Sequence, residues 1–555
     1  MLLKVLIRLG CFGICFGSLS LLAAPQKPLR ITMIQEWSQF NPITYNLASV
    51  EALLPFLIRG LTARTADGGV IPDLAESIPS LKNKTAVKII ENGNSKVQAS
   101  WRISPKAKWG DGKPVICADF KLAWMIGSHK NVSTQSRANY LKIQNVEWDE
   151  KWPQNCKVTY SGQDWSFDRD LPYPIPSHLE ALVFEGHKNE SEGYDRNSTY
   201  VKDPTLAGLY SGPYLVKEFK LGSHVVLEPN PHYGGKTPEI QKIIITHLSD
   251  TSAIRAQLLS NQTDVVSAVG FPLDTAIALA DESEKEAVPF KVRFQSSSIF
   301  QGLFMQADQG PLKEVLVRKA IAFAIDKETL VKAFFYGKID AANSFLPQLH
   351  SAFVKKPVEF SRDQARASLE QAGWVIGRNG NREKEGKPLS LEFKTSAGIK
   401  VYENIQLQIC DQLKQVGVVC KIKNEPPRVL LGESVPKGQF DLALFGQPIT
   451  PETSLTSSFS SVEIPSEKNS WAGGNVMRWR NLKLDSLLKA FDQEWSPNKR
   501  NAIIKKMEDL YIQDRPFVPL YHRKEAMVIP KALQGVSDDF GGTGFAFPEK
   551  WTWRP

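Results

Sequence analysis

The strongest constraint on the fold is the unbroken alternation of strand-like and helix-like segments along all 555 residues of the chain. Residues 97–103 (VQASWRI) alternate in the manner of a strand, and after a turn the helical segment 119–128 begins at Asp119, a good N-cap residue. Residues 312–324 again have helical spacing, and residues 515–529 return as a strand. Such alternation predicts an α/β architecture.

No Pro- or Ser-rich linker divides the chain into separate units. The length exceeds that of one ordinary domain and is sufficient for two or three hydrophobic cores. We therefore expect lobes made of discontinuous segments rather than independent domains in a row. The hydrophobic fraction of 42% and the charged fraction of 23% are typical of a soluble globular protein.

The net positive charge of the chain is small for its length and is not concentrated in one segment. The net charge of +9 falls by two, to +7, if Lys4 and Arg8 leave with an N-terminal leader, and no block of five like charges occurs. Residues 101–120 combine lysines with two tryptophans, but a nucleic-acid surface would need the charges on one face beside exposed aromatic rings. The lysines fall on a Gly- and Pro-containing turn between two packed elements, so we expect no nucleic-acid partner.

The N-terminus has the layout of a secretory signal. Lys4 and Arg8 lie in a basic start, residues 9–26 carry no charge, and two alanines end the apolar run. We expect a cleaved signal peptide at residues 1–24 and export to the periplasm. An uncleaved membrane anchor is the alternative, because about 18 uncharged residues is borderline for a membrane span.

Four cysteines remain after cleavage of the leader: Cys117, Cys156, Cys410 and Cys420. In an oxidising compartment they allow three full pairings, and none has the CxxC spacing of zinc or redox sites. Residues 402–417 resemble a helix that stops at a glycine, and a short strand follows. That corner favours a Cys410–Cys420 disulfide, which would leave Cys117 with Cys156.

Patterns of catalytic chemistry are missing from the sequence. The eight histidines form no HExxH pair, and the GxSxG elbow, the P-loop and the dinucleotide-binding glycine pattern are absent. Paired glycosidase carboxylates have no fixed spacing, so an exported hydrolase stays as an alternative. We expect a binding protein without a cofactor or a metal, and not an enzyme.

A series of motifs resembles the family 5 extracellular solute-binding proteins, the peptide- and nickel-binding components of ABC importers. Residues 101–120 (WRISPKAKWGDGKPVICADF) are similar to the strand, turn and helix start that the family usually has near "LRKGVKWSDGTPLTAEDV". The other matches follow in family order: 68–77 (GGVIPDLAES), 211–235 (SGPYLVKEFKLGSHVVLEPNPHYGG), 317–338 (VRKAIAFAIDKETLVKAFFYGK), 364–374 (QARASLEQAGW), 440–446 (FDLALFG) and 515–522 (RPFVPLYH).

The resemblance implies the type II periplasmic-binding-protein fold of the large cluster, with two α/β lobes, an extra subdomain and a hinge of crossing strands. Lobe I would take residues 25–58, 181–298 and 524–555, with the extra subdomain at 59–180 and lobe II at 299–523. It also implies a monomer that captures oligopeptides for the permease subunits of an ABC importer in the inner membrane. The alternative is the same fold with a metallophore, a sugar or an opine-like compound as its solute.

The implied ligand site lies between the lobes. A peptide would form backbone hydrogen bonds with the strand edges at Tyr45–Ala48 and Ala443–Gln447. The candidates for the cleft wall are aromatic, and core packing is the alternative for each of them: Trp37, Tyr140, Phe445 and Tyr521. The full set of expected ligand contacts is Trp37, Tyr45, Asn46, Leu47, Tyr140, Phe445, Gly446, Gln447, Glu452 and Tyr521.

The sequence departs from the family where peptide-binding relatives carry an aspartate for the ligand's amine. Pro448–Thr450 occupy that place, and Glu452 is the nearest carboxylate. Leu444 stands where the relatives often have a basic residue. Because a buried ammonium needs a charged partner, we expect weak discrimination for a free amine unless Glu452 supplies the anchor.

Overall fold

The structure, a computed structural model, describes residues 27–554 apart from 45–46, 66–68, 92–93, 135–136, 163–164, 170, 249, 270, 286–287, 450–453, 470, 472 and 538–544. The expected signal peptide at residues 1–24 and the expected ligand contacts Tyr45, Asn46 and Glu452 lie outside the described residues.

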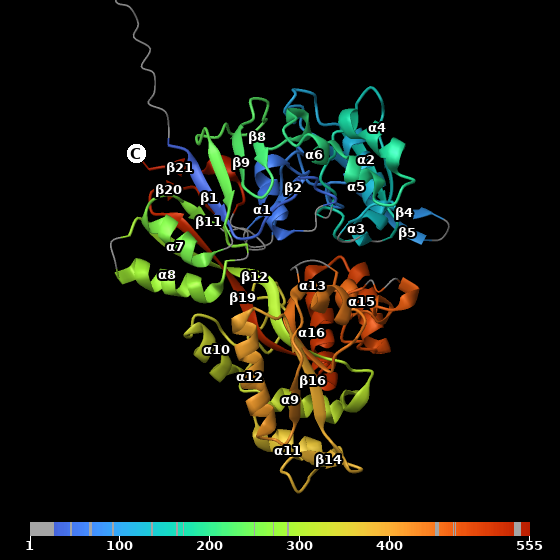
Figure 1. Cartoon of the computed structure of the whole chain (residues 1–555). Coiled ribbons are helices and arrows are strands. Elements are labelled where there is room, and N and C mark those ends of the chain that lie inside the picture. The colour runs from blue at the N-terminus through green and yellow to red at the C-terminus, as the bar shows by residue number, and fades with distance from the viewer. Residues whose placement is uncertain are drawn as a thin grey trace, which may run out of the picture.

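A ten-stranded sheet runs through both lobes (Figure 1). Its strands in spatial order are β17 (Val419–Ile422), β16 (Ser390–Thr395), β18 (Leu442–Pro448), β12 (Phe290–Met305), β19 (Phe517–Pro530), β11 (Val265–Val266), β1 (Leu29–Met33), β10 (Ile243–His247), β9 (His224–Pro229) and β8 (Tyr214–Lys220). Parallel pairs (β1 with β10 and β11, β16 with β17 and β18) meet antiparallel pairs at β12 and β19. The α/β architecture expected from the alternation is confirmed.

Lobe I is the upper lobe in Figure 1, and helices cover both faces of its part of the sheet. One face packs on α7 and α8, and the other faces a core that includes α1. The helices of this lobe are α1 (Ala48–Leu57), α4 (Ser177–His187), α5 (Gly193–Asn197), α6 (Thr199–Lys202), α7 (Thr251–Leu259) and α8 (Leu273–Lys285), with the short pair β20 (Leu533–Gln534)–β21 (Thr552–Trp553). The other short pair, β2 (Thr62–Arg64)–β3 (Val70–Pro72), lies in the segment expected for the extra subdomain, and its neighbours Leu61 and Leu74 pack in the core of that subdomain.

In lobe II, successive side chains along the strands face two different hydrophobic cores. Leu303 and Leu444 face one core, while Phe304 and Phe445 face the other, as the period of two requires. Its helices are α9 (Val315–Ala324), α10 (Lys327–Phe335), α11 (Arg362–Gln371), α12 (Lys400–Lys414), α13 (Pro427–Val429), α14 (Thr456–Phe459), α15 (Leu482–Gln493) and α16 (Pro497–Asp514), with a small sheet of β13 (Val375–Ile376), β14 (Arg382–Lys384) and β15 (Lys387–Pro388).

The two lobes are joined by the long strands β12 and β19. They pair antiparallel from Phe290↔Pro530 to Phe304↔Phe517, and the ladder is interrupted in the middle. Ser296 pairs with Lys524 and Phe300 with His522, so residues 297–299 lie opposite the single residue 523. A bulge of this kind bends the strand and breaks the regular ladder, which suits a hinge of crossing strands.

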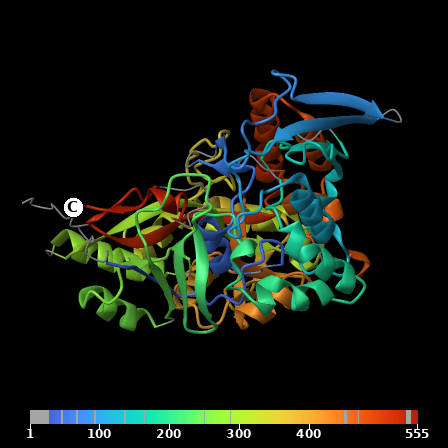
Figure 2. The same ribbon diagram turned by 90° about the horizontal axis from the view of Figure 1, so that it is seen from above.

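The extra subdomain is a four-stranded antiparallel sheet with its own core. The strand order is β4 (Ala86–Glu91), β5 (Asn94–Arg102), β7 (Asn155–Tyr160) and β6 (Ile143–Glu147), and α2 (Cys117–Ser128) and α3 (Ala138–Leu141) lie beside it. Figure 2 shows the β4–β5 hairpin extending away from the body of the molecule. The disulfide between Cys117 and Cys156, which ties the start of α2 to β7, is present as predicted.

Residues 101–120 serve the fold, as expected. Trp101 and Trp109 are buried, and the indole Nε1 of Trp109 donates to Asp119 Oδ2 at 2.9 Å. The N-cap prediction for Asp119 is wrong by three positions, because α2 begins at Cys117 after its N-cap Ile116. Asp119 instead accepts the backbone N–H of Ile116 from inside the first turn, at 3.0 Å. A carboxylate there still satisfies an orphan donor of the helix start.

The predicted Cys410–Cys420 disulfide is wrong for this structure, in which both cysteines are free thiols. Cys410 lies on α12 and Cys420 on β17, at the expected helix–strand corner. The hydrogen bond with Cys420, together with burial, raises the pKa of the Cys410 thiol. Because the thiolate is the species that reacts in disulfide exchange, a raised pKa slows the oxidation of this thiol.

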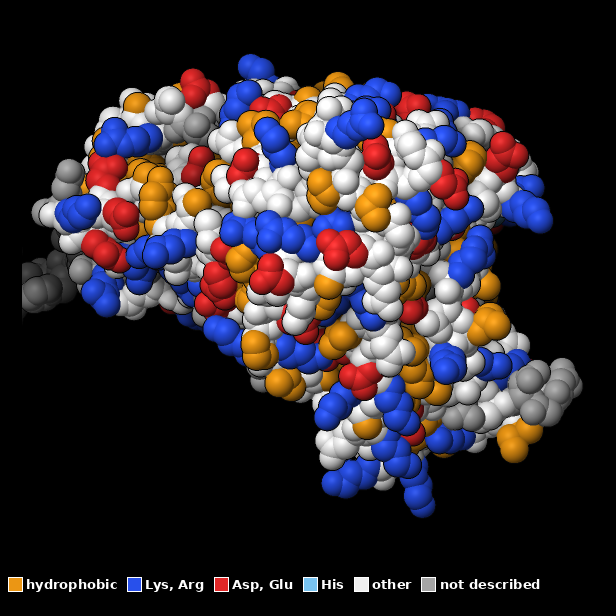
Figure 3. Space-filling view, turned by 90° about the horizontal axis from the view of Figure 1, so that it is seen from below, with side chains coloured by type: hydrophobic (Ala, Val, Ile, Leu, Met, Phe, Trp, Pro, Cys, Tyr) orange, Lys and Arg blue, Asp and Glu red, His pale blue; other side chains and the backbone are white. Residues whose placement is uncertain are grey.

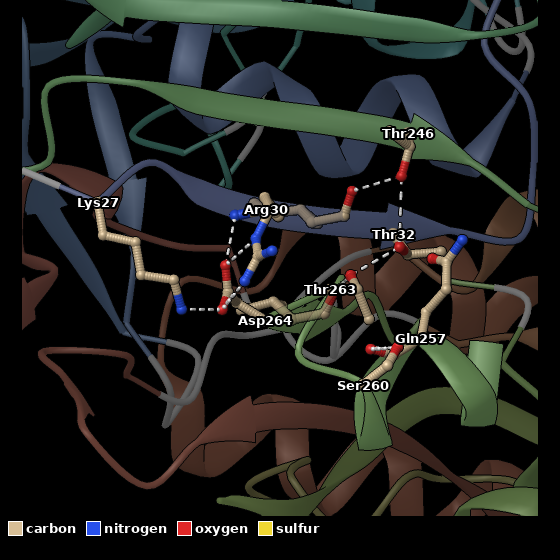
Figure 4. Close-up of polar contacts among 10 residues, drawn as sticks. Lys27, Arg30, Thr32, Thr246, Gln257, Ser260, Thr263 and Asp264 are labelled. Carbon is tan, nitrogen blue, oxygen red and sulfur yellow. Dashed lines mark hydrogen bonds and ion pairs between the residues drawn. The ribbon is translucent and has the colours of Figure 1, made fainter.

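Asp264 holds the shortest strand of the large sheet in place (Figure 4). It precedes β11, and its carboxylate accepts from Arg30 Nε at 2.9 Å, from Arg30 backbone N at 3.0 Å and from Lys27 Nζ at 2.7 Å. Burial alone would raise the pKa of Asp264, but the hydrogen bonds from Arg30 and Lys27 lower it. Thr32 and Thr263 hydroxyls meet at 2.7 Å beside this pair. These contacts fix the two-residue strand β11 against β1.

Surface charges are mixed on the face that Figure 3 shows. Lysine and arginine side chains are spread across it, with acidic side chains between them. On this face the net positive charge therefore forms no continuous basic surface, in agreement with the expectation from the sequence.

The C-terminal segment closes lobe I through a buried charge cluster. Arg59, directly after α1, pairs with Asp73 at 3.0 Å and with Glu549 at 3.0 Å, and the Arg59 and Glu549 side chains are each 6% exposed. Phe545 and Trp551 pack edge-on against Phe56 of α1. Phe545 and Trp551 thereby belong to the core of lobe I.

We predict that Arg59→Met lowers the free energy of unfolding by about 3–5 kcal/mol, because it leaves two buried carboxylates without their cation. Urea titration measures the change from the midpoint at constant slope. The matched control is Lys236→Met, whose partner Glu239 lies at 2.9 Å with both side chains more than half exposed, and we expect a loss below about 1 kcal/mol there. Equal losses in the two variants would contradict the prediction.

Candidate functional site between the lobes

Lobe II presents an open strand edge beside the crossing strands. On one side, β18 pairs with β12 along its whole length, from Ile299↔Pro448 to Met305↔Leu442. On its other side, within the described residues, β16 pairs with β18 only as far as Thr395↔Leu444. The far edge of residues 445–447 is therefore left without a strand partner. Backbone N–H and C=O groups on such an edge are available to an extended ligand.

The lobes also touch at a second place, where the extra subdomain meets lobe II. Trp165, 5% exposed, belongs to a core of lobe II, and the Arg500 guanidinium lies 3.7 Å from its ring centroid. The ring of Trp165 also meets Phe491 edge-on at 5.8 Å. Nearby, Phe167 and Lys88 contact the ring of Trp495, at 5.7 Å and 4.8 Å. We call these residues (Lys88, Trp165, Phe167, Phe491, Trp495 and Arg500) the aromatic latch.

Most of the expected cleft aromatics are packed in cores. Trp37 is buried with its edge on His247 at 6.4 Å. Phe445 stacks on Phe304 at 4.0 Å, and Tyr521 tilts against Phe335 at 4.8 Å. For these three the structure shows the alternative that the sequence left open, which is core packing.

The remaining expected residues divide into two groups. Tyr140 of α3 lies against Gly127 of α2, and burial raises its pKa to about 12. Leu47 precedes α1 and packs against the lobe I core. Gly446 and Gln447, by contrast, lie on the open part of β18. Gln447 is mostly buried, and its Nε2 reaches the carbonyl of Gly474 at 3.5 Å.

Two polar residues at this place were not expected from the sequence. Gln301 of β12 pairs with Gly446 on one side and with Tyr521 on the other, and it is fully buried. Arg523 of β19 lies opposite the bulge, and its side chain is 33% exposed. Their proximity depends on strand register, and we find no motif in the sequence that would have identified them.

No metal centre is formed within the described part of the chain, where no three His, Cys, Asp or Glu side chains come together in a suitable group. Nor does any helix of the described residues combine the length and the apolar composition that a membrane crossing requires.

Comparison with known proteins decides the family. Residues 69–464 match the bacterial extracellular solute-binding proteins, family 5 Middle. The chain belongs to this family. Oligopeptide-binding protein AppA of Bacillus subtilis is 24% identical to it over 557 residues, which cover 96% of this chain and 95% of that protein.

Solved structures agree on the fold of this solute-binding protein. The oligopeptide-binding protein of Thermus thermophilus, complexed with a pentapeptide, has a TM-score of 0.77 at 22% identity and covers 95% of this chain and 96% of that one. NikZ of Campylobacter jejuni, in complex with Ni(L-His), has a TM-score of 0.76 at 22% identity over 95% of this chain and 100% of that one. The predicted two-lobed fold is confirmed.

The crossing strands carry a buried histidine, His522. Burial lowers the pKa of His522 to about 4, and neither ring nitrogen has a hydrogen-bond partner among the described residues. Between pH 6.5 and pH 4 the unfolded chain therefore binds a proton that the folded chain does not. Stability contributed by this group is lost as the pH falls through that window.

We predict that His522→Phe, which keeps an aromatic ring against Phe353, flattens the pH dependence of stability. The wild type should lose about 2–3 kcal/mol more than the variant between pH 6.5 and pH 4. Urea titrations over this range test the difference, and a comparison at pH 7.5, where the imidazole is neutral, isolates the packing effect. Parallel curves for the two proteins would refute the assignment.

Proposed function

We propose that this protein is the periplasmic substrate-binding component of an ABC importer, and that it captures peptides between its lobes. In this proposal the leader at residues 1–24 directs export and is removed. The monomer then delivers its peptide to the permease subunits in the inner membrane.

The open edge of β18 at residues 445–447 is the observation that carries the proposal. A peptide added there as a further strand gains main-chain hydrogen bonds that do not depend on its side chains. Binding through the backbone suits a protein that accepts many sequences, while waters in the surrounding space accommodate varied side chains. The relatives named above as oligopeptide-binding proteins support the same ligand class.

Capture requires the lobes to move relative to each other. The bulge in β12 concentrates bending at residues 297–299, and the aromatic latch joins the lobes at a second place. A ligand that contacts both lobes favours the closed arrangement, because only then are its contacts complete. No chemical step is needed for this function.

Native mass spectrometry of protein from a periplasmic fraction tests the ligand class. We expect a mixture of co-purified masses that resolve into peptides after denaturation. A single non-peptide compound would replace the peptide proposal by the metallophore, sugar or opine-like alternative. Hydrolysis of an added peptide by the pure protein would instead favour the exported hydrolase.

A variant of the latch tests closure. Trp165→Ala removes the cation–π contact with Arg500 and the contact with Phe491, which together are worth about 1–3 kcal/mol. We expect ligand to dissociate about 10- to 100-fold faster, since each 1.4 kcal/mol is tenfold. Small-angle scattering should also show a larger radius of gyration in the variant.

Trp152→Ala is the matched control, because Trp152 is 64% exposed. It should leave the dissociation rate and the scattering unchanged. If Trp165→Ala behaves like this control, the latch has no role in closure.

A further inference from the structure

The outer side of the helix pair α15–α16 in lobe II carries an apolar groove. Residues 494–496 join the two helices, and so short a connection makes them run antiparallel; Figure 1 shows them at one margin of the lobe. The groove between them has a volume of about 590 Å³. Three leucines, two lysines and one aspartate line it: Leu482, Leu487, Leu510, Lys483, Lys506 and Asp509.

The fold already has a core on the inner side of these helices. Leu484, Leu488 and Phe491 of α15 are buried there together with Ile504, Met507 and Tyr511 of α16. The groove adds a second apolar row, in which Leu482 is 84% exposed and Leu487 and Leu510 are half-buried. A single exposed leucine is ordinary, but apolar side chains gathered in one open groove mark an interaction site.

The charged residues at the rim of the groove are available to a partner. Lys483, Lys506 and Asp509 are exposed, and none of them has an ion pair among the described residues. By contrast, Glu508, next to Asp509, is buried and pairs with Lys356 at 2.9 Å. Two lysines against one aspartate make the rim net positive, so it complements a surface on which carboxylates predominate.

The shape of the groove favours a helix as its occupant. The lining residues 482–487 of α15 span about 9 Å at 1.5 Å per residue, which matches one to two turns of a docked helix. An amphipathic helix places aliphatic side chains at positions i, i+3, i+4 and i+7 into such a groove. An anionic lipid surface fits less well, because Asp509 would face it. The leader of this chain fits less well too, because Lys4 and Arg8 repeat the charge of the rim.

We propose that the α15–α16 groove is a docking site for an acidic amphipathic helix of a partner protein. The helix lays aliphatic side chains against the three leucines and places carboxylates beside Lys483 and Lys506. Asp509 pairs with a cationic residue of the helix and so fixes its direction. This site is separate from the open edge of β18, and the inference goes beyond the proposed function.

Fluorescence anisotropy with two designed peptides tests the charge match. The first probe is a labelled 16-residue helix with leucines at i, i+3, i+4 and i+7 and glutamates beside them, and the second has lysines in place of the glutamates. The glutamate peptide should bind the mature protein about tenfold more tightly or better. The double variant Lys483→Glu/Lys506→Glu should reverse this preference. Lys414→Glu, which changes an exposed lysine of α12, should keep it.

Equal binding of the two peptides to the wild type overturns the proposal, as does the absence of binding by both. A double variant that still prefers the glutamate peptide also overturns it, because the lysines of the rim would then have no part in recognition.

Leu482→Gln tests the apolar part of the groove. We expect the glutamate peptide to bind about tenfold more weakly, since one of three apolar contacts is lost. Because Leu482 is 84% exposed, the urea midpoint should not change. The matched control is Leu182→Gln on α4, where the leucine is 87% exposed, and it should leave the affinity unchanged. The same affinity in both variants overturns the role of the groove.

Two further measurements test other occupants. If the wild type sediments with phosphatidylglycerol vesicles and the double lysine variant does not, the groove contacts a membrane and the helix proposal is overturned. If light scattering shows a dimer for the wild type and a monomer for Leu482→Gln, the occupant is a second copy of this chain, which also overturns it. We expect no sedimentation and a monomer in both proteins.

Discussion

The antiparallel pairing of β12 with β19 is the interaction on which the rest of the structure depends. Both strands contribute to the sheet of each lobe, so every other strand of the ten-stranded sheet is placed relative to this pair. The ladder is regular towards its two ends, and its register shifts lie between Ser296 and Phe300 and between Gln301 and Gly302. The irregular pairing is thus confined to a few residues between two packed bodies, which is the arrangement that hinge closure requires.

Local patterns in the sequence were sufficient for much of the fold. The alternation of strand-like and helix-like segments predicted the α/β architecture. The series of motifs that resemble family 5 proteins predicted the crossing strands. The buried tryptophans at 101 and 109 and the Cys117–Cys156 disulfide agree with the expectations. Two predictions were wrong because three-dimensional geometry, and not the local pattern, determines the outcome. They are the N-cap of α2 and the Cys410–Cys420 disulfide.

The candidate site was harder to predict, because it is assembled by register. Gln301 meets Gly446 and Arg523 only through pairings between strands more than a hundred residues apart. The sequence analysis favoured aromatic residues as the wall of the cleft, but the rings of Phe445 and Tyr521 pack in cores. The polar residues at the crossing strands, Gln301 and Arg523, belong to no recognisable sequence motif. Their proximity comes from strand register, which only the folded chain reveals.

The charge cluster around Arg59 has a consequence for the order in which the protein folds. Its hydrogen bond with Glu549 joins residues 490 positions apart, and Trp551 completes the core of lobe I. Contacts of such high sequence separation form late, because a long loop must be closed before they contribute. Lobe II can complete its two cores almost entirely from residues after 300. Lobe I therefore stays incomplete until Phe545 and Trp551 have joined its core, whereas lobe II needs no residue from that segment.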